Sequence, residues 1–179
     1  MLWVNWSYVS AAGCEFISYL RLLSGPNLPK SGKRYGRVGV AMNHSLSRGS
    51  AHCASADPQQ QPEIDARYYE HDADLTLHIE AAKYTLRNAQ TLLMRDPLER
   101  EHSPGREVQT DEQLRDWVKL TMSAACNTAV SCSMFPRATN GVVDPTLKVY
   151  GTQSLRVADL SLVPLHFASH TQATVYAIA

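Results

Sequence analysis

The side chains best suited to acid–base or metal chemistry in this sequence are its seven histidines. His166 and His170 have the spacing of a helical ligand pair, but Pro164 and the loop-like context argue against a helix there. The other histidines form no HxxH or HExxH pair, and we assign them to strands, helix caps or solvent: His44, His52, His71, His78 and His102. The sequence therefore predicts no metal site.

Nucleophiles and nucleotide-binding loops are equally sparse. No serine lies in a GxSxG turn, so hydrolase chemistry has no support. The sequence contains neither GxGxxG nor GxxxxGK[ST], the loops that hold dinucleotide or triphosphate groups at a helix N-terminus. The cysteines form no CxxC pair and are interpreted as small buried hydrophobes: Cys14, Cys53, Cys126 and Cys132.

The bulk composition is that of one ordinary globular domain. The chain has 179 residues, 44% of them hydrophobic, and its 17 basic residues balance 17 acidic ones. A neutral chain gives no electrostatic argument for nucleic acid or an anionic membrane as a partner. The apolar N-terminus lacks a basic leader and is interrupted by Glu15 and Arg21, so neither a secretory signal nor a membrane span is expected.

The elements before residue 70 are predicted from alternation and turn residues. Residues 24–36 are rich in proline and glycine and indicate a linker. Val38, Val40 and Met42 alternate with small or polar residues and predict a strand. A Ser-Arg-Gly turn at 47–49 would return the chain as a second strand over 50–55, followed by a loop over 57–62.

The elements after residue 70 begin with two helices. A stripe from Leu75 to Leu93 predicts a helix from Asp72, its N-cap, to about Met94. Thr110 and Gln113 form a capping box for a helix that would run to about residue 125. Short strands are expected over 147–150 and 155–158, and a last helix over 171–179. That helix lacks a C-terminal capping signal, so we expect the chain to be truncated at this end.

Five segments, in this order, resemble the C-terminal region of glucose–methanol–choline (GMC) oxidoreductases. They are NHSLSRGSAHCASADP at 43–58, IDARYYEHDADL at 64–75, VQTDEQLRDWV at 108–118, GVVDPTLKVYG at 141–151, and LRVADLSLVP with His-Thr-Gln at 155–172. The resemblance covers about four-fifths of the chain. It implies an FAD-dependent enzyme that oxidises an alcohol by hydride transfer to flavin, while a paired His/His or His/Asn site takes the hydroxyl proton.

The resemblance assigns residues to that site by motif position. His170 matches the second member of the pair. Asn127 stands where the family's His-Pro-x-Gly-Thr-Cys motif has its histidine, and an amide cannot accept a proton near neutral pH. Val130 stands where the motif has glycine, and its bulk would crowd the flavin. By the same matching, the cofactor contacts would come from Asp159, Leu160 and Thr171.

The expected fold is α+β, an antiparallel sheet backed by two long helices, without the FAD-binding Rossmann part. Residues 1–35 would be a non-matching segment and linker, and residues 36–179 the C-terminal GMC domain. The leading hypothesis is a part of an FAD-dependent oxidoreductase acting on CH–OH groups, inactive alone and dependent on a separate FAD-binding part. The alternative is a non-catalytic remnant or binding module that keeps the fold without flavin.

Overall fold

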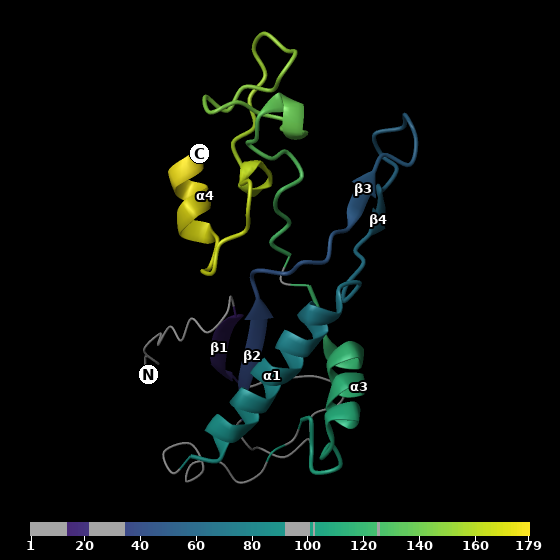
Figure 1. Cartoon of the computed structure of the whole chain (residues 1–179), viewed down its shortest axis with the longest axis vertical. Coiled ribbons are helices and arrows are strands. Elements are labelled where there is room, and N and C mark those ends of the chain that lie inside the picture. The colour runs from purple at the N-terminus through teal and green to yellow at the C-terminus, as the bar shows by residue number, and fades with distance from the viewer. Residues whose placement is uncertain (1–13, 22–34, 92–100, 102, 125) are drawn as a thin grey trace.

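The computed structural model describes residues 14–21, 35–91, 101, 103–124 and 126–179. Two two-stranded antiparallel sheets and three α-helices make up the regular structure of these residues. Figure 1 shows α1 and α3 beside the β1–β2 sheet in one part of the molecule, and α4 with the C-terminal loops in the other. The α+β class is therefore confirmed, but the expected single sheet is two separate sheets.

The first sheet pairs β1 (Cys14–Arg21) with β2 (Tyr35–Met42) along their whole length. The alternation at Val38, Val40 and Met42 thus predicted β2 correctly. β1 lies inside the segment that we expected to be separate from the domain, and its backbone continues the same sheet. The predicted linker falls largely on residues outside the described ones.

The second sheet is a short hairpin of β3 (Ser50–His52) and β4 (Glu63–Asp65), drawn in blue in Figure 1. The predicted strand over 50–55 is shorter than expected and pairs forward with β4 instead of back with β2. Gly49 explains the tight entry, because a Cβ there would lie 2.4 Å from the main-chain oxygen of Asp65. Only glycine lets the two backbones approach this closely.

Helices α1 (Asp72–Ala89) and α3 (Asp111–Thr121) share one hydrophobic core. The predicted stripe supplies that core, which consists of Leu75, Ile79, Ala82, Leu114 and Val118. The capping box is confirmed, with the Thr110 side chain accepting from the Gln113 amide and the Gln113 side chain accepting from the Thr110 amide.

Three predicted helix ends were wrong. The N-cap of α1 is His71, whose Nδ1 accepts from the Ala73 amide at 3.2 Å, so Asp72 is the first helical residue. α1 ends at Ala89, before the expected Met94. α3 ends at Thr121 because Met122 is extended, with a ψ of 147°. Among the described helices, none is long and apolar enough to cross a membrane.

The C-terminal part has its own hydrophobic cluster, built on Val143, Leu160, Leu162 and Val163. The predicted strands over 147–150 and 155–158 are only isolated bridges, Val143 with Val149 and Lys148 with Arg156. Two 3-10 turns, η1 (Arg137–Thr139) and η2 (Leu160–Leu162), and helix α4 (Gln172–Ile178) complete this part. The last helix is therefore confirmed.

Candidate functional site

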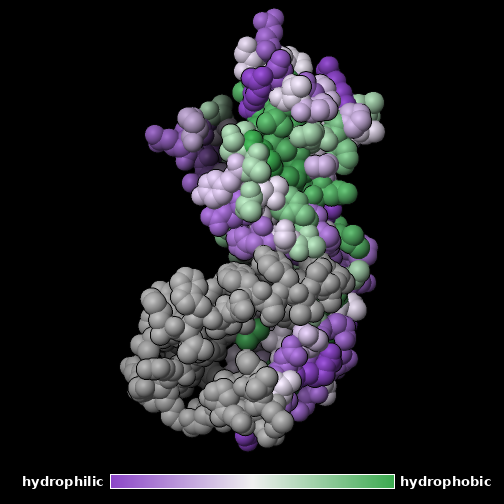
Figure 2. All heavy atoms as spheres, turned by 90° about the vertical axis from the view of Figure 1, so that its left-hand side faces the viewer, coloured by the Kyte–Doolittle hydropathy of each residue, from purple (hydrophilic) through white to green (hydrophobic). Residues whose placement is uncertain are grey.

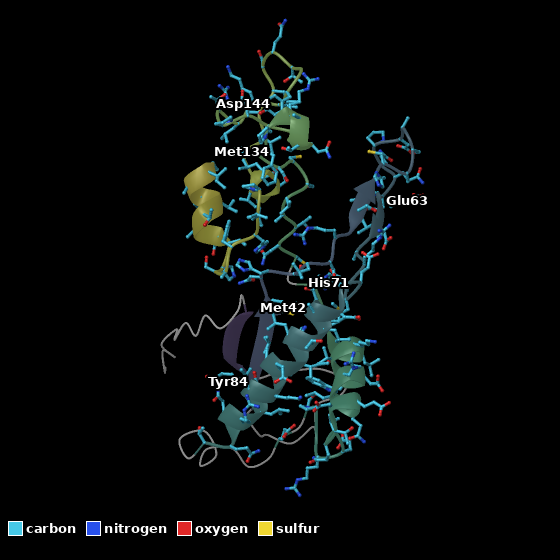
Figure 3. All side chains as sticks on the ribbon, in the orientation of Figure 1. Met42, Glu63, His71, Tyr84, Met134 and Asp144 are labelled. Carbon is cyan, nitrogen blue, oxygen red and sulfur yellow. The ribbon has the colours of Figure 1, made fainter. Side chains whose placement is uncertain are left out.

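The loop that carries Asn127 is attached to the closing segment of the chain by main-chain hydrogen bonds. The amide of Cys132 donates to the carbonyl of Ser161 at 2.9 Å, and the amide of Met134 donates to that of Leu162 at 2.8 Å. Met134 is labelled in Figure 3, where it lies within the C-terminal part. These bonds bring residues 127–134 beside residues 159–163, although about thirty positions separate them in sequence.

Val130 has the backbone conformation of a glycine. Its φ is 74°, in the left-handed region, which a β-branched residue rarely adopts. The Ser133 hydroxyl donates to the Val130 carbonyl, and the Val130 side chain packs against the C-terminal cluster. The replacement of the motif's glycine by valine therefore leaves a strained main chain at this position.

Asn127 and Thr171 are joined across 44 positions of sequence. The Thr171 hydroxyl donates to Asn127 Oδ1 at 3.2 Å. Thr171 is only 4% exposed, while Asn127 and His170 are exposed. Since His170 precedes Thr171 directly, the structure brings the two residues of the predicted pair into one region of the surface.

Asp159 caps the turn that follows it. Its Oδ1 accepts from the Ser161 amide at 2.8 Å. Hydrogen bonds from the Ser161 side chain and amide hold the pKa of Asp159 below its usual value, so the carboxylate stays ionised. Leu160 differs from Asp159, because its side chain is buried in the C-terminal cluster. Only the main chain of Leu160 could therefore contact a ligand.

The remaining histidines have local roles. His166 lies in a loop, as predicted, where Nδ1 is 3.1 Å from the carbonyl of Phe167 and the two rings pack 5.5 Å apart. His78 was assigned with the others to a strand, a cap or solvent, but it lies inside α1 and is partly buried against Tyr69, whose hydroxyl lies 2.7 Å from His78 Nδ1. In the described part of the chain, no group of three His, Cys, Asp or Glu side chains could hold a metal ion.

Two cysteines are not the buried hydrophobes that we expected. Cys53 and Cys126 are exposed, and Cys132 is half-buried. Cys126 also has a φ of 57°, and it directly precedes Asn127. Its place in a turn at the entrance to the loop explains why its side chain does not reach the core.

Sequence reasoning missed Asp74, a buried acid that joins α1 to the Ser-Arg-Gly turn. Its carboxylate accepts from the amides of Leu46 and Ser47 at 2.8 Å each and from the Ser47 hydroxyl at 2.5 Å. Burial acts to raise the pKa of Asp74, but these hydrogen bonds outweigh it and lower the pKa below its usual value. An acidic residue on the apolar side of the predicted stripe, next to Leu75, was the available signal.

The comparison with known protein families identifies this arrangement. The GMC oxidoreductase C-terminal family model matches residues 45–179. The chain belongs to the GMC oxidoreductase family. The match begins nine residues after the boundary expected at residue 36 and includes every residue of the predicted site.

Curated GMC relatives share a substantial part of the sequence. The chain is 37% identical over 142 residues to the GMC oxidoreductase family protein Mala s 12 of Malassezia sympodialis, which covers 79% of the chain and 23% of the relative. It is 40% identical over 131 residues to an oxygen-dependent choline dehydrogenase of Staphylococcus xylosus, covering 72% of the chain and 23% of the relative. The chain thus spans about a quarter of the length of these GMC relatives.

Solved structures of two oxidases share the fold of this chain. A formate oxidase from Aspergillus oryzae superposes with a TM-score of 0.77 at 29% identity, covering 84% of the chain and 26% of that structure. A fungal aryl-alcohol oxidase superposes with a TM-score of 0.68 at 32% identity, covering 80% and 24%. The elements described above therefore form the C-terminal GMC arrangement.

Proposed function

We propose that this chain is the substrate-side part of an FAD-dependent oxidoreductase acting on CH–OH groups, with His170 and Asn127 as its reacting pair. The observation that carries the proposal is the hydrogen bond between Thr171 and Asn127, because it draws Asn127 toward the residue next to His170. A GMC relative and two solved structures named as oxidases or dehydrogenases support the reaction class.

The two residues have different capacities. Histidine accepts a proton near neutral pH, so His170 is suited to take the hydroxyl proton of the alcohol. Asn127 can only donate or accept hydrogen bonds, so it orients the hydroxyl. FAD, when bound, supplies the oxidation by accepting hydride from the alcohol carbon.

Part of the cofactor would find partners in this chain. The ionised carboxylate of Asp159 is exposed and suited to a ribityl hydroxyl. The main chains of Leu160 and Thr171 are the other expected contacts, since no described residue accepts from the Thr171 amide. The sequence has no glycine-rich loop for the pyrophosphate. We infer that a separate FAD-binding part completes the site.

The exposed apolar surface of the C-terminal part supports the proposal that a separate FAD-binding part packs against this chain. Figure 2 shows apolar side chains gathered on one face of the C-terminal part. Leu165 is 69% exposed and Tyr176 75% exposed in this part of the chain. Exposed apolar surface of this kind marks a contact with another protein part or a ligand.

The second candidate is a non-catalytic protein that keeps the fold without flavin. The strained Val130 favours it, because a φ of 74° is suited to the glycine that the motif has there. Asn127 in the place of the motif's histidine favours it as well. Under this alternative the Asn127–Thr171 contact is a structural remnant.

A flavin titration separates the two candidates. Purified chain is titrated with FAD, alone and after mixing with the N-terminal part of the Malassezia relative, while flavin fluorescence and absorbance are followed. Binding in the mixture, with turnover of benzyl alcohol that is lost in His170→Ala and kept in His166→Ala, supports the oxidoreductase. A folded chain that binds no flavin under either condition contradicts it and supports the non-catalytic alternative.

A further inference from the structure

We propose that Thr171 is a positioning residue, whose hydroxyl engages Oδ1 of Asn127 so that the amide presents Nδ2 as a donor to the substrate oxygen. This inference rests on the proposed function and deepens it. It assigns opposite tasks to the two members of the pair: Asn127 donates a hydrogen bond, and His170 takes the proton.

The first step is the unusual role of the Thr171 side chain. Thr171 stands at the N-cap of α4, where a threonine oxygen ordinarily accepts from an amide two or three residues later. Here it makes no capping bond, and its φ and ψ of −76° and −19° are already helical. Its hydroxyl instead donates to Asn127, so this side chain serves a contact outside its own helix.

The second step is the orientation of the Asn127 amide. Thr171 as a whole residue is only 4% exposed, so its hydroxyl needs an acceptor for its proton, because leaving a buried hydroxyl unpaired costs about 1–3 kcal/mol. Asn127 Oδ1 is the only acceptor of the Thr171 hydroxyl among the described residues. If the amide were rotated, Nδ2 would face the threonine and that proton would have no described acceptor, so the hydrogen-bond network assigns Oδ1 to Thr171.

The third step is what this orientation leaves free. Asn127 is exposed, and its Nδ2 donates to no residue in the part of the chain that the structure describes. The loop that carries it is held by the hydrogen bonds of Cys132 and Met134 to the closing segment. The amide is therefore fixed at its oxygen and open at its nitrogen.

The chemical consequence is a division of labour. When the O–H bond of the alcohol breaks, its proton passes to a ring nitrogen of His170 and the electron pair stays on the oxygen. A fixed N–H donor stabilises an oxygen that gains negative charge. Asn127 presents such a donor through Nδ2, whereas an amide free to rotate would also present its own oxygen, which repels an oxygen that gains negative charge.

The test begins with side-chain amide NMR of the 179-residue chain labelled with 15N. The Asn127 signals are identified by their loss in Asn127→Asp. We expect them to move in Thr171→Val, which removes the hydroxyl at nearly constant shape, and to stay in place in Thr171→Ser. The signals of Asn140 serve as a control for the fold. An unchanged Asn127 signal in Thr171→Val overturns the proposal.

A second measurement covers the case in which Thr171→Val does not fold. Asn127→Asp keeps an acceptor for the buried hydroxyl, whereas Asn127→Ala removes it. We expect the thermal midpoint of Asn127→Ala to lie about 2–4 °C below that of Asn127→Asp. Equal midpoints would mean that the Thr171 hydroxyl does not depend on Asn127, and would overturn the inference.

Turnover distinguishes this inference from the proposed function. With benzyl alcohol as the probe and the FAD-binding part supplied, we expect Thr171→Val to lower kcat by about 10- to 100-fold and Thr171→Ser to retain it. Turnover that is unchanged in Thr171→Val, despite moved Asn127 signals, overturns the positioning role alone. Moved signals with no turnover in any variant support the fixed amide and contradict the oxidoreductase function.

Discussion

Asp74 accepts hydrogen bonds from both the main-chain amide and the side-chain hydroxyl of Ser47, which lies 27 positions earlier in the sequence. The Leu46 amide adds a third bond to the same carboxylate. Figure 3 shows His71, three residues before Asp74, at the start of α1 and close to the end of β2, marked by Met42. One buried acid thus fixes the turn between the two sheets onto the first helix.

We predict that Asp74→Asn lowers the free energy of unfolding by about 1.5–3 kcal/mol, because the amide nitrogen cannot accept and the charge is lost. Urea unfolding at neutral pH measures the change. The matched control is Asp72→Asn, an exposed acid in the same first turn. An equal loss in both variants would show that the helix N-terminus, and not the turn contact, is responsible.

The pKa of Asp74 adds a pH dependence to this prediction. Because its pKa is lower in the folded chain than in the unfolded one, its stabilisation is present above the unfolded value of about 3.9 and lost as pH falls through the folded pKa. The difference between wild type and Asp74→Asn should therefore shrink at acidic pH. A difference that stays constant down to the acid transition would contradict it.

At position 130, glycine and alanine substitutions should have the reverse of their usual order of stability. At most positions glycine is the less stable of the two, but its freedom at positive φ favours it where φ is 74°. We predict that Val130→Gly is more stable than Val130→Ala by about 1 kcal/mol. Val157, which packs against the same cluster without a positive φ, is the control and should show the usual order.

Gly141 and Gly151 are required for different reasons: a close contact with neighbouring backbone at Gly141, and a positive φ at Gly151. A Cβ at Gly141 would lie 1.7 Å from the Phe135 carbonyl oxygen, whereas a Cβ at Gly151 would meet only the Arg137 side chain at 4.0 Å. Gly151→Ala should cost about 1–2 kcal/mol through its φ of 80°. We expect Gly141→Ala to cost about 3 kcal/mol or more, measured by thermal unfolding of both variants. Equal costs would exclude the clash.

His78 should make the chain less stable in mild acid. Burial lowers the pKa of His78 below its usual value, so the unfolded chain binds its proton first and stability falls as pH drops below about 6.5. We predict that the free energy of unfolding falls less steeply with pH in His78→Gln than in wild type, by up to about 1.4 kcal/mol per pH unit. Denaturant unfolding between pH 5 and 7.5 measures it, with exposed His52→Gln as the control that keeps the slope.

Local signals predicted the elements whose residues interact with near neighbours. The capping box at Thr110, the stripe from Leu75 and the alternation at Val38 each act within a few residues, and each was confirmed. The resemblance of five ordered segments predicted the family, which the family match confirms. Locally encoded structure was therefore accessible from the sequence.

Contacts between distant residues were not accessible. The prediction that β3 returns along β2 was wrong. Its actual partner β4 is exposed at every residue, so β4 carries no alternation that could have indicated the pairing. The acceptors of the Ser47 and Thr171 hydroxyls lie 27 and 44 positions away, and a hydroxyl gives no sequence signal of its partner. The roles of Asn127 and His170 remain predictions, since their chemistry depends on the ligand that they face.

The two hydrophobic clusters draw on separate stretches of the chain, residues 69–118 and 129–178. During synthesis the first stretch leaves the ribosome before the second, so α1 and α3 can pack while the C-terminal loops are still being made. Asn127 lies between the stretches, and Thr171 emerges 44 positions after it. The contact between Asn127 and Thr171 therefore forms only after the second stretch has been made, so a nascent chain can bury its first core before the candidate site exists.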